Sequence, residues 1–213
     1  MTQANDSILV TPGSGATVAT HLANSKEHQV VILATPDGHL YGSEPTYIYA
    51  TGNSANVAAA RTTHFDLFNA AGSGVEIEIF GIYIIPTLAA VTGVGLTWEI
   101  ARSTSVGTGG TTKTAAPMDT SNAAVPAQVT ARSKPTGGAT ISTVITYPNT
   151  SSEETTPYAG MASQLNHLAF LGNGAAGPLQ PLILAEGQGI KIDQTTSSAV
   201  GSTNIVVVCA IHA

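Results

Sequence analysis

The chain has little charge, a single cysteine and few aromatic residues. Its 213 residues include 7 Lys and Arg against 13 Asp and Glu, so the formal net charge is −6 and only 9% of residues are charged. Globular domains usually contain about 25% charged residues, so the surface must consist largely of Thr, Ser, Asn, Gln, Gly and Ala. Such a surface suits a protein that packs against copies of itself or against another assembly, and it is also found in secreted adhesins.

These scarcities argue against several classes of function. Nucleic-acid binding depends on Lys and Arg that contact phosphates, and this acidic chain has only seven scattered cations. The most apolar window, 82–96, is interrupted by Pro86, Gly93 and Gly95, so no window reaches the roughly 18 apolar residues that a membrane span needs. The first ten residues lack the basic and apolar regions of a secretory signal, which predicts synthesis in a cytoplasm.

Two single residues are expected in the core. Cys209 has no second cysteine with which to form a disulfide inside the chain, and it lies in the apolar run 205–211. We therefore expect a small core residue rather than a reactive or intermolecular thiol. Trp98 lies in period-two step with Leu96 and Ile100, which predicts a core position rather than a platform for stacking a sugar.

The chain is rich in strand patterns. Val75, Ile77 and Ile79 fall on one face of an extended strand, because successive side chains point to opposite sides. Glu76 and Glu78 fall on the other face, and similar alternation returns near the carboxyl end. We expect eight or nine strands in the main domain, at 63–69, 75–85, 94–103, 125–130, 140–147, 167–171, 181–184, 189–194 and 204–212. The pattern predicts an all-β fold, an antiparallel β-sandwich of jelly-roll type.

The first 60 residues differ from the rest in their pattern of short strands and frequent turns. Short candidate strands at 7–10, 29–35 and 46–50 are separated by turns rich in Pro and Gly. A segment of this kind is too short to bury a core of its own. We therefore expect an N-terminal extended arm or small β module at 1–60, followed by a sandwich domain at 61–213.

Candidate catalytic and metal-binding groups are sparse. His64 and Asp66 lie two apart on a predicted strand and would share a face, but a zinc site needs three or four ligands with recognisable spacing. The other histidines do not cluster, so His64 is expected at the rim of a sheet. Glu76 and Glu78 would lie about 7 Å apart, as paired acid and base carboxylates could, yet solvated residues on an outer face account for them.

Motifs of known enzyme classes are also missing from the sequence. There is no Gly-x-Ser-x-Gly nucleophile elbow. The glycines at 72–74 lie between two strand patterns and lack the Lys and the helix of a phosphate loop, which predicts a tight hairpin turn. We expect no catalytic residue, no cofactor, no metal site and no enzymatic activity. Recognition, if any, would use the long loops at 103–114 and 150–160.

Several segments carry a resemblance to a known family. HFDLFNAAGSGVEIEIFGIYIIP at 64–86 and LAEGQGIKIDQTTSSAVGSTNIVVVCAI at 184–211 resemble structural proteins of tailed bacteriophages and their prophages, and the likeness covers 61–213. HQVVILATPDGHLYGSEPTYIYA at 28–50 is similar to the amino-terminal segments by which phage virion proteins dock to a capsid or tail.

The resemblance implies a virion component, a capsid decoration (cement) protein that binds and stabilises the head lattice. It implies that the arm contacts the major capsid protein or other virion subunits and that the sandwich forms a homo-oligomer, with a trimer favoured. It implies no nucleic-acid or membrane partner. A tail or fibre-base protein is the nearest variant. A receptor-binding or carbohydrate-binding module would use the two long loops, the second of which is flanked by Tyr147 and Tyr158. A cupin-like enzyme would need a His/Glu metal cluster that the sequence does not supply.

Overall fold

A computed structural model describes residues 9–10, 16–17, 20–23, 26–29, 45–59, 61–88, 94–152, 168–169, 181–199 and 201–212. The chain divides into two compact units, Met1–Glu44 and Pro45–Ala213. Every named element in the described residues is a β-strand, so the expected all-β fold is confirmed. Within these same residues, no helix has the length and apolar character needed to cross a membrane.

The first unit contains two hairpins. Strand β1 (Leu9–Val10) pairs with β2 (Ala16–Thr17), and β3 (Thr20–Ala23) pairs with β4 (Lys26–Gln29). The strand expected at 29–35 lies outside the described residues apart from Gln29.

The boundary between the units falls after Glu44 rather than after residue 60. Strands β5 (Thr46–Ala50) and β6 (Ser54–Ala55) both pair with the last strand of the sandwich, β18 (Ser202–His212). Tyr47 and Tyr49 of β5 also enter the sandwich core. Residues 45–59, which the sequence assigned to the arm, therefore belong to the sandwich.

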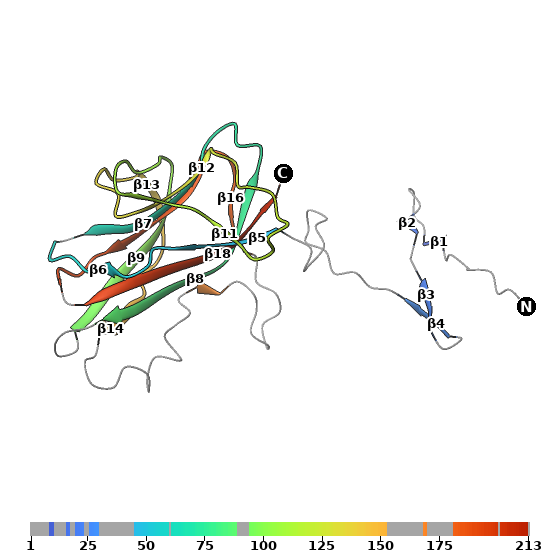
Figure 1. Ribbon diagram of the computed structural model, residues 1–213, viewed down its shortest axis with the longest axis horizontal. Coiled ribbons are helices and arrows are strands. Elements are labelled where there is room, and N and C mark those ends of the chain that lie inside the picture. Colours follow the sequence, from blue (N-terminus) through green and yellow to red (C-terminus); the bar gives the residue numbers. More distant parts are fainter. Residues whose placement is uncertain are drawn as a thin grey trace, which may run out of the picture. The chain divides into compact units, whose positions relative to one another are not determined.

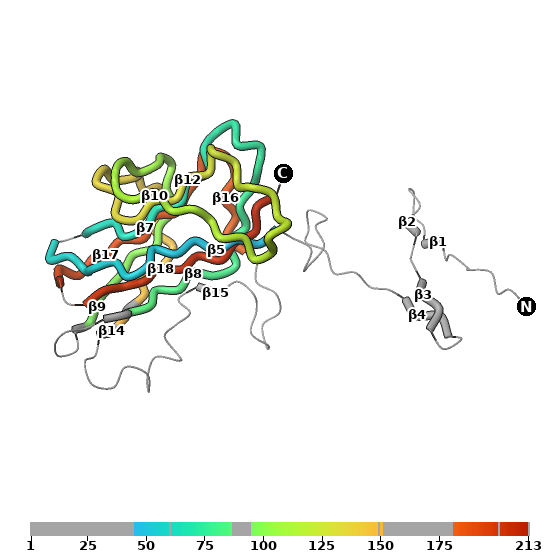
Figure 2. Tube along the Cα trace, viewed as in Figure 1, coloured from blue at the N-terminus to red at the C-terminus, as the bar shows by residue number. Residues whose placement is uncertain are grey.

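The second unit is a β-sandwich of two antiparallel sheets (Figures 1 and 2). The remaining strands are β7 (Thr62–Asn69), β8 (Glu76–Leu88), β9 (Val94–Ser103), β10 (Thr111–Lys113), β11 (Ala116–Pro117), β12 (Val129–Ser133), β13 (Ile141–Thr146), β14 (Asn149–Ser152), β15 (Leu168–Ala169), β16 (Leu182–Leu184) and β17 (Gln188–Gln194). Sheet I has the order β10-β12-β7-β17-β9-β13, with β14 also paired to β9. Sheet II has the order β11-β5-β18-β8-β15, with β16 also paired to β8 and β6 to β18.

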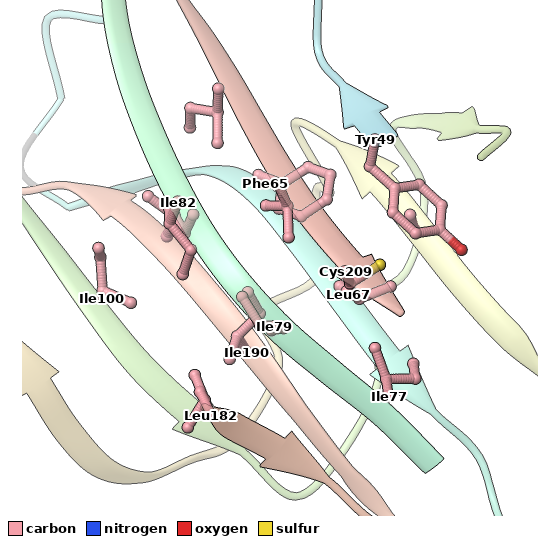
Figure 3. Close-up of a cluster of buried hydrophobic side chains, with 14 of the residues drawn as sticks. Tyr49, Phe65, Leu67, Ile77, Ile79, Ile82, Ile100, Leu182, Ile190 and Cys209 are labelled. Atoms are coloured by element: carbon pink, nitrogen blue, oxygen red, sulfur yellow. The ribbon is translucent and has the colours of Figure 1, made fainter. Parts of the chain in front are cut away.

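The core lies between the two sheets and consists mainly of β-branched and aromatic side chains (Figure 3). In strand β18, buried and half-buried residues alternate along most of the length, because successive side chains of a strand point to opposite faces of the sheet. Burying one such aliphatic side chain stabilises the fold by about 1.5–3 kcal/mol. Trp98 and Cys209 are fully buried, which confirms both core predictions. The indole Nε1–H of Trp98 donates to Thr150 Oγ1 at 2.8 Å, so β14 is tied to the core of sheet I.

Two register shifts change which side chains face the core. In sheet II, Val208 pairs with Gly81 and Cys209 pairs with Ile79, so Phe80 has no partner of its own in β18. The fully buried residues of β8 accordingly change from Ile77 and Ile79 to Ile82 and Ile84. In sheet I, Ile192 pairs with Phe65 and Asp193 with Thr63, so His64 is the extra residue of β7.

Candidate functional site

The outer face of sheet I is covered by the chain itself. Two loops, 104–110 and 134–140, pair with each other where the Thr108 N–H donates to the Gly137 carbonyl at 3.0 Å. We call these two segments the loop cover. Gly110 has a φ of +69°, and a Cβ there would lie 2.5 Å from the carbonyl oxygens of Ser133 and Lys134. Only glycine fits that position. The expected loop at 103–114 is therefore an ordered part of the sandwich and includes the short strand β10.

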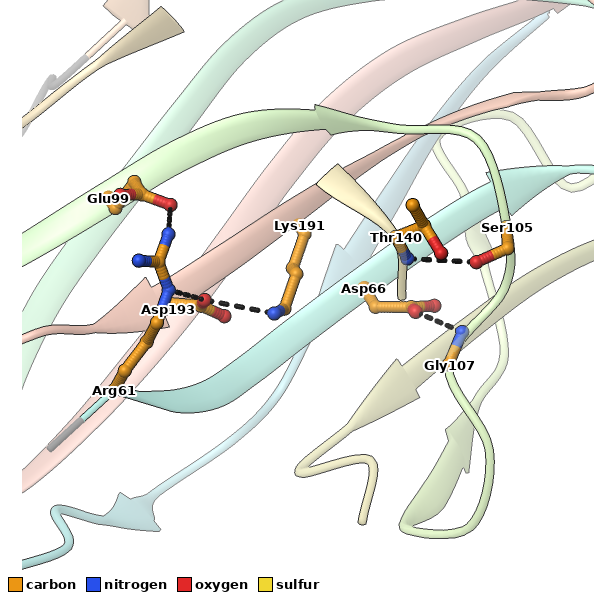
Figure 4. A network of polar contacts seen from close by, with 8 residues as sticks. All are labelled: Arg61, Asp66, Glu99, Ser105, Gly107, Thr140, Lys191 and Asp193. Carbon is orange, nitrogen blue, oxygen red and sulfur yellow. Dashed lines mark hydrogen bonds and ion pairs between the residues drawn. The ribbon is translucent and has the colours of Figure 1, made fainter. Parts of the chain in front are cut away.

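Asp66 lies beneath the loop cover and is fully buried. Its Oδ2 accepts the Gly107 N–H at 2.6 Å (Figure 4). Its register neighbours are Arg132 on β12 and Lys191 on β17. Burial raises the pKa of Asp66 above the ordinary aspartate value, while the Gly107 amide and the charges of Arg132 and Lys191 act in the opposite direction. The side chain thus holds loop 104–110 against the sheet.

Asp193, Arg61 and Glu99 form ion pairs next to Lys191 on the outer face of sheet I. Lys191 Nζ lies 3.0 Å from Asp193 Oδ2, and Arg61 Nε lies 3.2 Å from the same oxygen (Figure 4). The Arg61 guanidinium also pairs with Glu99. Arg61 has a φ of 59°, the left-handed region that is costly for a residue with a side chain. We call the six residues the charge network; its members are Arg61, Asp66, Glu99, Arg132, Lys191 and Asp193.

The charge network contains three cations and three carboxylates, so its charges balance. Glu99, Asp193 and Lys191 are almost wholly shielded from solvent. Removing one partner from a buried ion pair is strongly destabilising because the other charge is left without compensation. Each carboxylate is bound by a cation or a backbone amide, which suits the network to holding strands and loops together.

All six Lys and Arg residues of the second unit bind partners within the chain. Besides the ion pairs above, long cationic side chains donate to backbone carbonyls of distant segments. These bonds are Arg102 Nη1 to Ile183 O at 2.9 Å, Lys113 Nζ to Thr51 O at 2.7 Å, Arg132 Nη1 to Gly109 O at 3.2 Å, and Lys134 Nζ to Ala55 O. The cations of this unit are therefore committed to its own loops and strands.

His64 and Asp66 do not come together, contrary to the expectation from their spacing. Because His64 is the extra residue at the register shift, its ring packs edge-on against Trp98, with centroids 5.0 Å apart. Its Nε2 lies 3.0 Å from Gln194 Oε1. Asp66 instead contacts the loop cover. His64 is also fully buried, so the expected position at a sheet rim is wrong. Burial and the charge of Lys134 lower the pKa of His64 to about 4.

Glu76 and Glu78 differ in their surroundings. Glu76 is half-buried, whereas Glu78 is only 5% exposed and lies 3.3 Å from His212. The expectation of a solvated Glu78 is therefore wrong, because β16 pairs with β8 at that position, with Ile183 opposite Glu78. Across the described part of the chain, no group of three or more His, Cys, Asp and Glu residues is placed to hold a metal ion.

The glycines at 72–74 form a turn between β7 and β8, but β7 lies in sheet I and β8 in sheet II. The two strands do not pair, so the expected tight hairpin is wrong and the turn links the two sheets. The carboxylate of Glu186 accepts hydrogen bonds from the Gly74 N–H at 2.7 Å and the Gly72 N–H at 3.1 Å. These amides hold the pKa of Glu186 below its usual range. The phosphate-loop resemblance of the segment thus has a local explanation: its amides bind a carboxylate of the same chain.

The sequence did not single out Arg61, Glu99, Lys191, Asp193 or Gln194. The one usable signal was the alternation of Lys191 and Asp193 with Ile190 and Ile192, which places both charges on one face of a strand. Nothing in that pattern shows that distant loops cover the face.

The second long loop, 150–160, lies outside the described residues beyond Ser152. Comparisons of the chain with protein-family models, with curated proteins and with solved structures find no match.

Proposed function

We propose that this protein is a structural subunit of a tailed-phage virion, a capsid decoration protein that binds and stabilises the head lattice. The observation that carries the proposal is the internal use of charge: every cation of the unit Pro45–Ala213 binds its own chain. Such a unit offers mainly neutral polar and apolar groups for contact with its surroundings, which favours close contact between many copies. The resemblance of 61–213 to phage structural proteins points the same way.

The outer face of sheet II supports a homo-oligomer, for which the family resemblance favours a trimer. Ile48, Val206, Val208 and Tyr83 alternate with core residues along three adjacent strands and are half-buried rather than covered. Antiparallel sheets that face water usually carry polar residues on that side. An apolar outer face is typical of a sheet that becomes covered in an assembly.

We further propose that the sandwich is a jelly roll. Eight strands, β5, β7, β8, β9, β13, β16, β17 and β18, run in chain order. They give the orders β5-β18-β8-β16 in sheet II and β7-β17-β9-β13 in sheet I. In a jelly roll the first strand lies beside the last, and the second lies beside the last but one. The pairings β5 with β18 and β7 with β17 support this topology.

In this proposal the unit Met1–Glu44 makes the contact with the major capsid protein or another virion subunit. Short hairpins such as β1-β2 and β3-β4 leave backbone groups free to pair with a strand of a partner. Repetition of one weak contact over a symmetric lattice then gives strong binding through avidity.

The test is binding of the purified full chain to capsids assembled without it, with phage tails as a parallel target. We expect binding to capsids that saturates with the same number of copies at every equivalent site of the lattice. The binding should persist at high salt, because the cations of the sandwich already bind carboxylates or backbone carbonyls of their own chain. Bare capsids at saturating protein concentration would refute the proposal, and binding to tails alone would favour a tail or fibre-base protein. A chain that begins at Pro45, checked first for folding, shows whether the unit Met1–Glu44 carries the contact.

A further inference from the structure

One end of the sandwich is closed by two segments, 51–59 and 195–199, and both are held by the carboxamide of Gln194. Its Nε2 donates to Val57 O at 3.1 Å and lies 2.7 Å from both Thr196 O and Ser198 O. Its Oε1 accepts the Val57 N–H at 3.1 Å. We call 51–59 and 195–199 the closing segments. A single buried side chain therefore connects them to strand β17.

The same carboxamide fixes the protonation of His64. Since Gln194 Oε1 can only accept, the imidazole Nε2 at 3.0 Å must carry the proton of that bond. The other ring nitrogen, Nδ1, is buried and has no hydrogen-bond partner within the described part of the chain. A proton added at Nδ1 would place an unpaired charge in the core against Trp98.

We propose that His64 is an acid-sensitive latch: protonation of Nδ1 breaks the hydrogen bonds between the Gln194 carboxamide and the closing segments while the two sheets stay folded. The device goes beyond the proposed function and does not depend on it. The closing segments contain one short strand, the two-residue β6. Outside it they are held by side-chain hydrogen bonds and by a few backbone hydrogen bonds, among them Thr51 N–H to Ile205 O at 3.0 Å, Asn56 N–H to Gly201 O at 3.0 Å and Thr195 N–H to Thr97 O at 2.8 Å. Such segments open at a lower free-energy cost than strands in the middle of a sheet.

The charged groups around His64 favour its neutral form. Lys134, whose backbone N–H donates to His64 O at 3.1 Å, opposes a second positive charge. The Asp193 carboxylate would attract a positive charge on His64, but Arg61 and Lys191 already pair with that carboxylate. Burial adds the largest contribution in the same direction as Lys134. The hydrogen bond to Gln194 Oε1 favours the charged form of His64, but burial and Lys134 outweigh it. The imidazolium therefore gains more by reaching solvent than by staying against the core, and on leaving it gives up its bond to Gln194.

The opening is measured by amide hydrogen exchange of the full chain at neutral pH and at about pH 4, after correction for intrinsic exchange rates. For a group with a pKa of about 4 when buried and 6.5 when free, the opening equilibrium rises by roughly a hundredfold over this range. We expect that gain at Val57 and in 195–199, with β17 and β18 still protected. Trp98 fluorescence gives a second signal, because the indole loses its edge-on contact with the His64 ring when the imidazolium moves to solvent.

Two substitutions separate the latch from other histidines. His64→Gln should abolish the acid-induced opening, whereas His212→Gln, at a histidine that pairs with Glu78 in sheet II, should leave it unchanged. If His64→Gln fails to fold, nitrogen NMR of the wild-type imidazole decides: the ring should carry its proton on Nε2 at neutral pH and titrate well below 6.5. Ordinary titration near 6.5, closing segments that stay protected at about pH 4, or equal loss of protection throughout both sheets would overturn the proposal.

Discussion

Replacing Lys191 by Met tests whether the charge network stabilises the sandwich. Lys191 is 7% exposed, and its Nζ lies 3.0 Å from Asp193 Oδ2. Methionine preserves much of the side-chain length but removes the charge, so three carboxylates then face two cations. Breaking a buried ion pair by removing one partner costs about 3–5 kcal/mol. Because Arg61 continues to bind Asp193, we expect a loss at the lower end, about 3 kcal/mol.

Urea unfolding followed by Trp98 fluorescence gives the free energy of unfolding of the second unit, with the dependence on urea unchanged. The matched control is Lys113→Met. Lys113 is less buried and donates one hydrogen bond to Thr51 O at 2.7 Å, so its loss should cost about 1 kcal/mol. The double variant Lys191→Met with Asp193→Asn should recover part of the loss, which measures the coupling of the pair. If Lys191→Met costs no more than Lys113→Met, the network is solvated and the argument for its role fails.

Three further predictions concern close packing, the thiol and pH. Gly107→Ala places a Cβ 2.5 Å from Asp66 Oδ2 and should lower the free energy of unfolding by about 2 kcal/mol; Gly138→Ala, whose nearest contact is at 3.8 Å, should change it by less than about 0.5 kcal/mol in the same urea titration. Burial raises the pKa of the Cys209 thiol to about 12, so a thiol reagent should modify it only in unfolded protein, and rapid labelling of the native chain would contradict the core position. Since the folded-state pKa of His64 lies at about 4, below the ordinary 6.5, its contribution to stability is complete above 6.5 and is lost as the pH falls toward 4. The loss should be about 2 kcal/mol by about pH 5. The difference between wild type and His64→Gln isolates this contribution, because the opposite trend of Asp66 is common to both.

Most strands were predictable because their alternation is local. The expected strands at 63–69, 94–103, 189–194 and 204–212 match β7, β9, β17 and β18 closely. Strand β14 was missed, because Asn149–Ser152 is polar and becomes a strand only by pairing with β9. The segment 111–117 was assigned to loops for the same reason. Its two short strands form because β12 and β5 offer partners at the edges of the two sheets.

The candidate site was less predictable than the fold. The spacing of His64 and Asp66 predicted a shared face, and one extra residue in β7 placed them on different sides. Glu78 was expected to be solvated because no local pattern shows that β16 pairs beside it. Gln194 lies at the end of an apolar strand, and its role depends on closing segments that come from two places in the chain.

The sequence by itself determined that this protein is an all-β sandwich and which strands supply much of its core, since period-two alternation is a property of each segment alone. The register shifts at Phe80 and His64 were decided only by the tertiary structure, because a bulge depends on how two strands pair. The burial of the charge network was decided in the same way. Charges on the outer face of a strand stay solvated unless another part of the chain covers them, and here the covering loops lie some 40 to 70 residues away from Asp66.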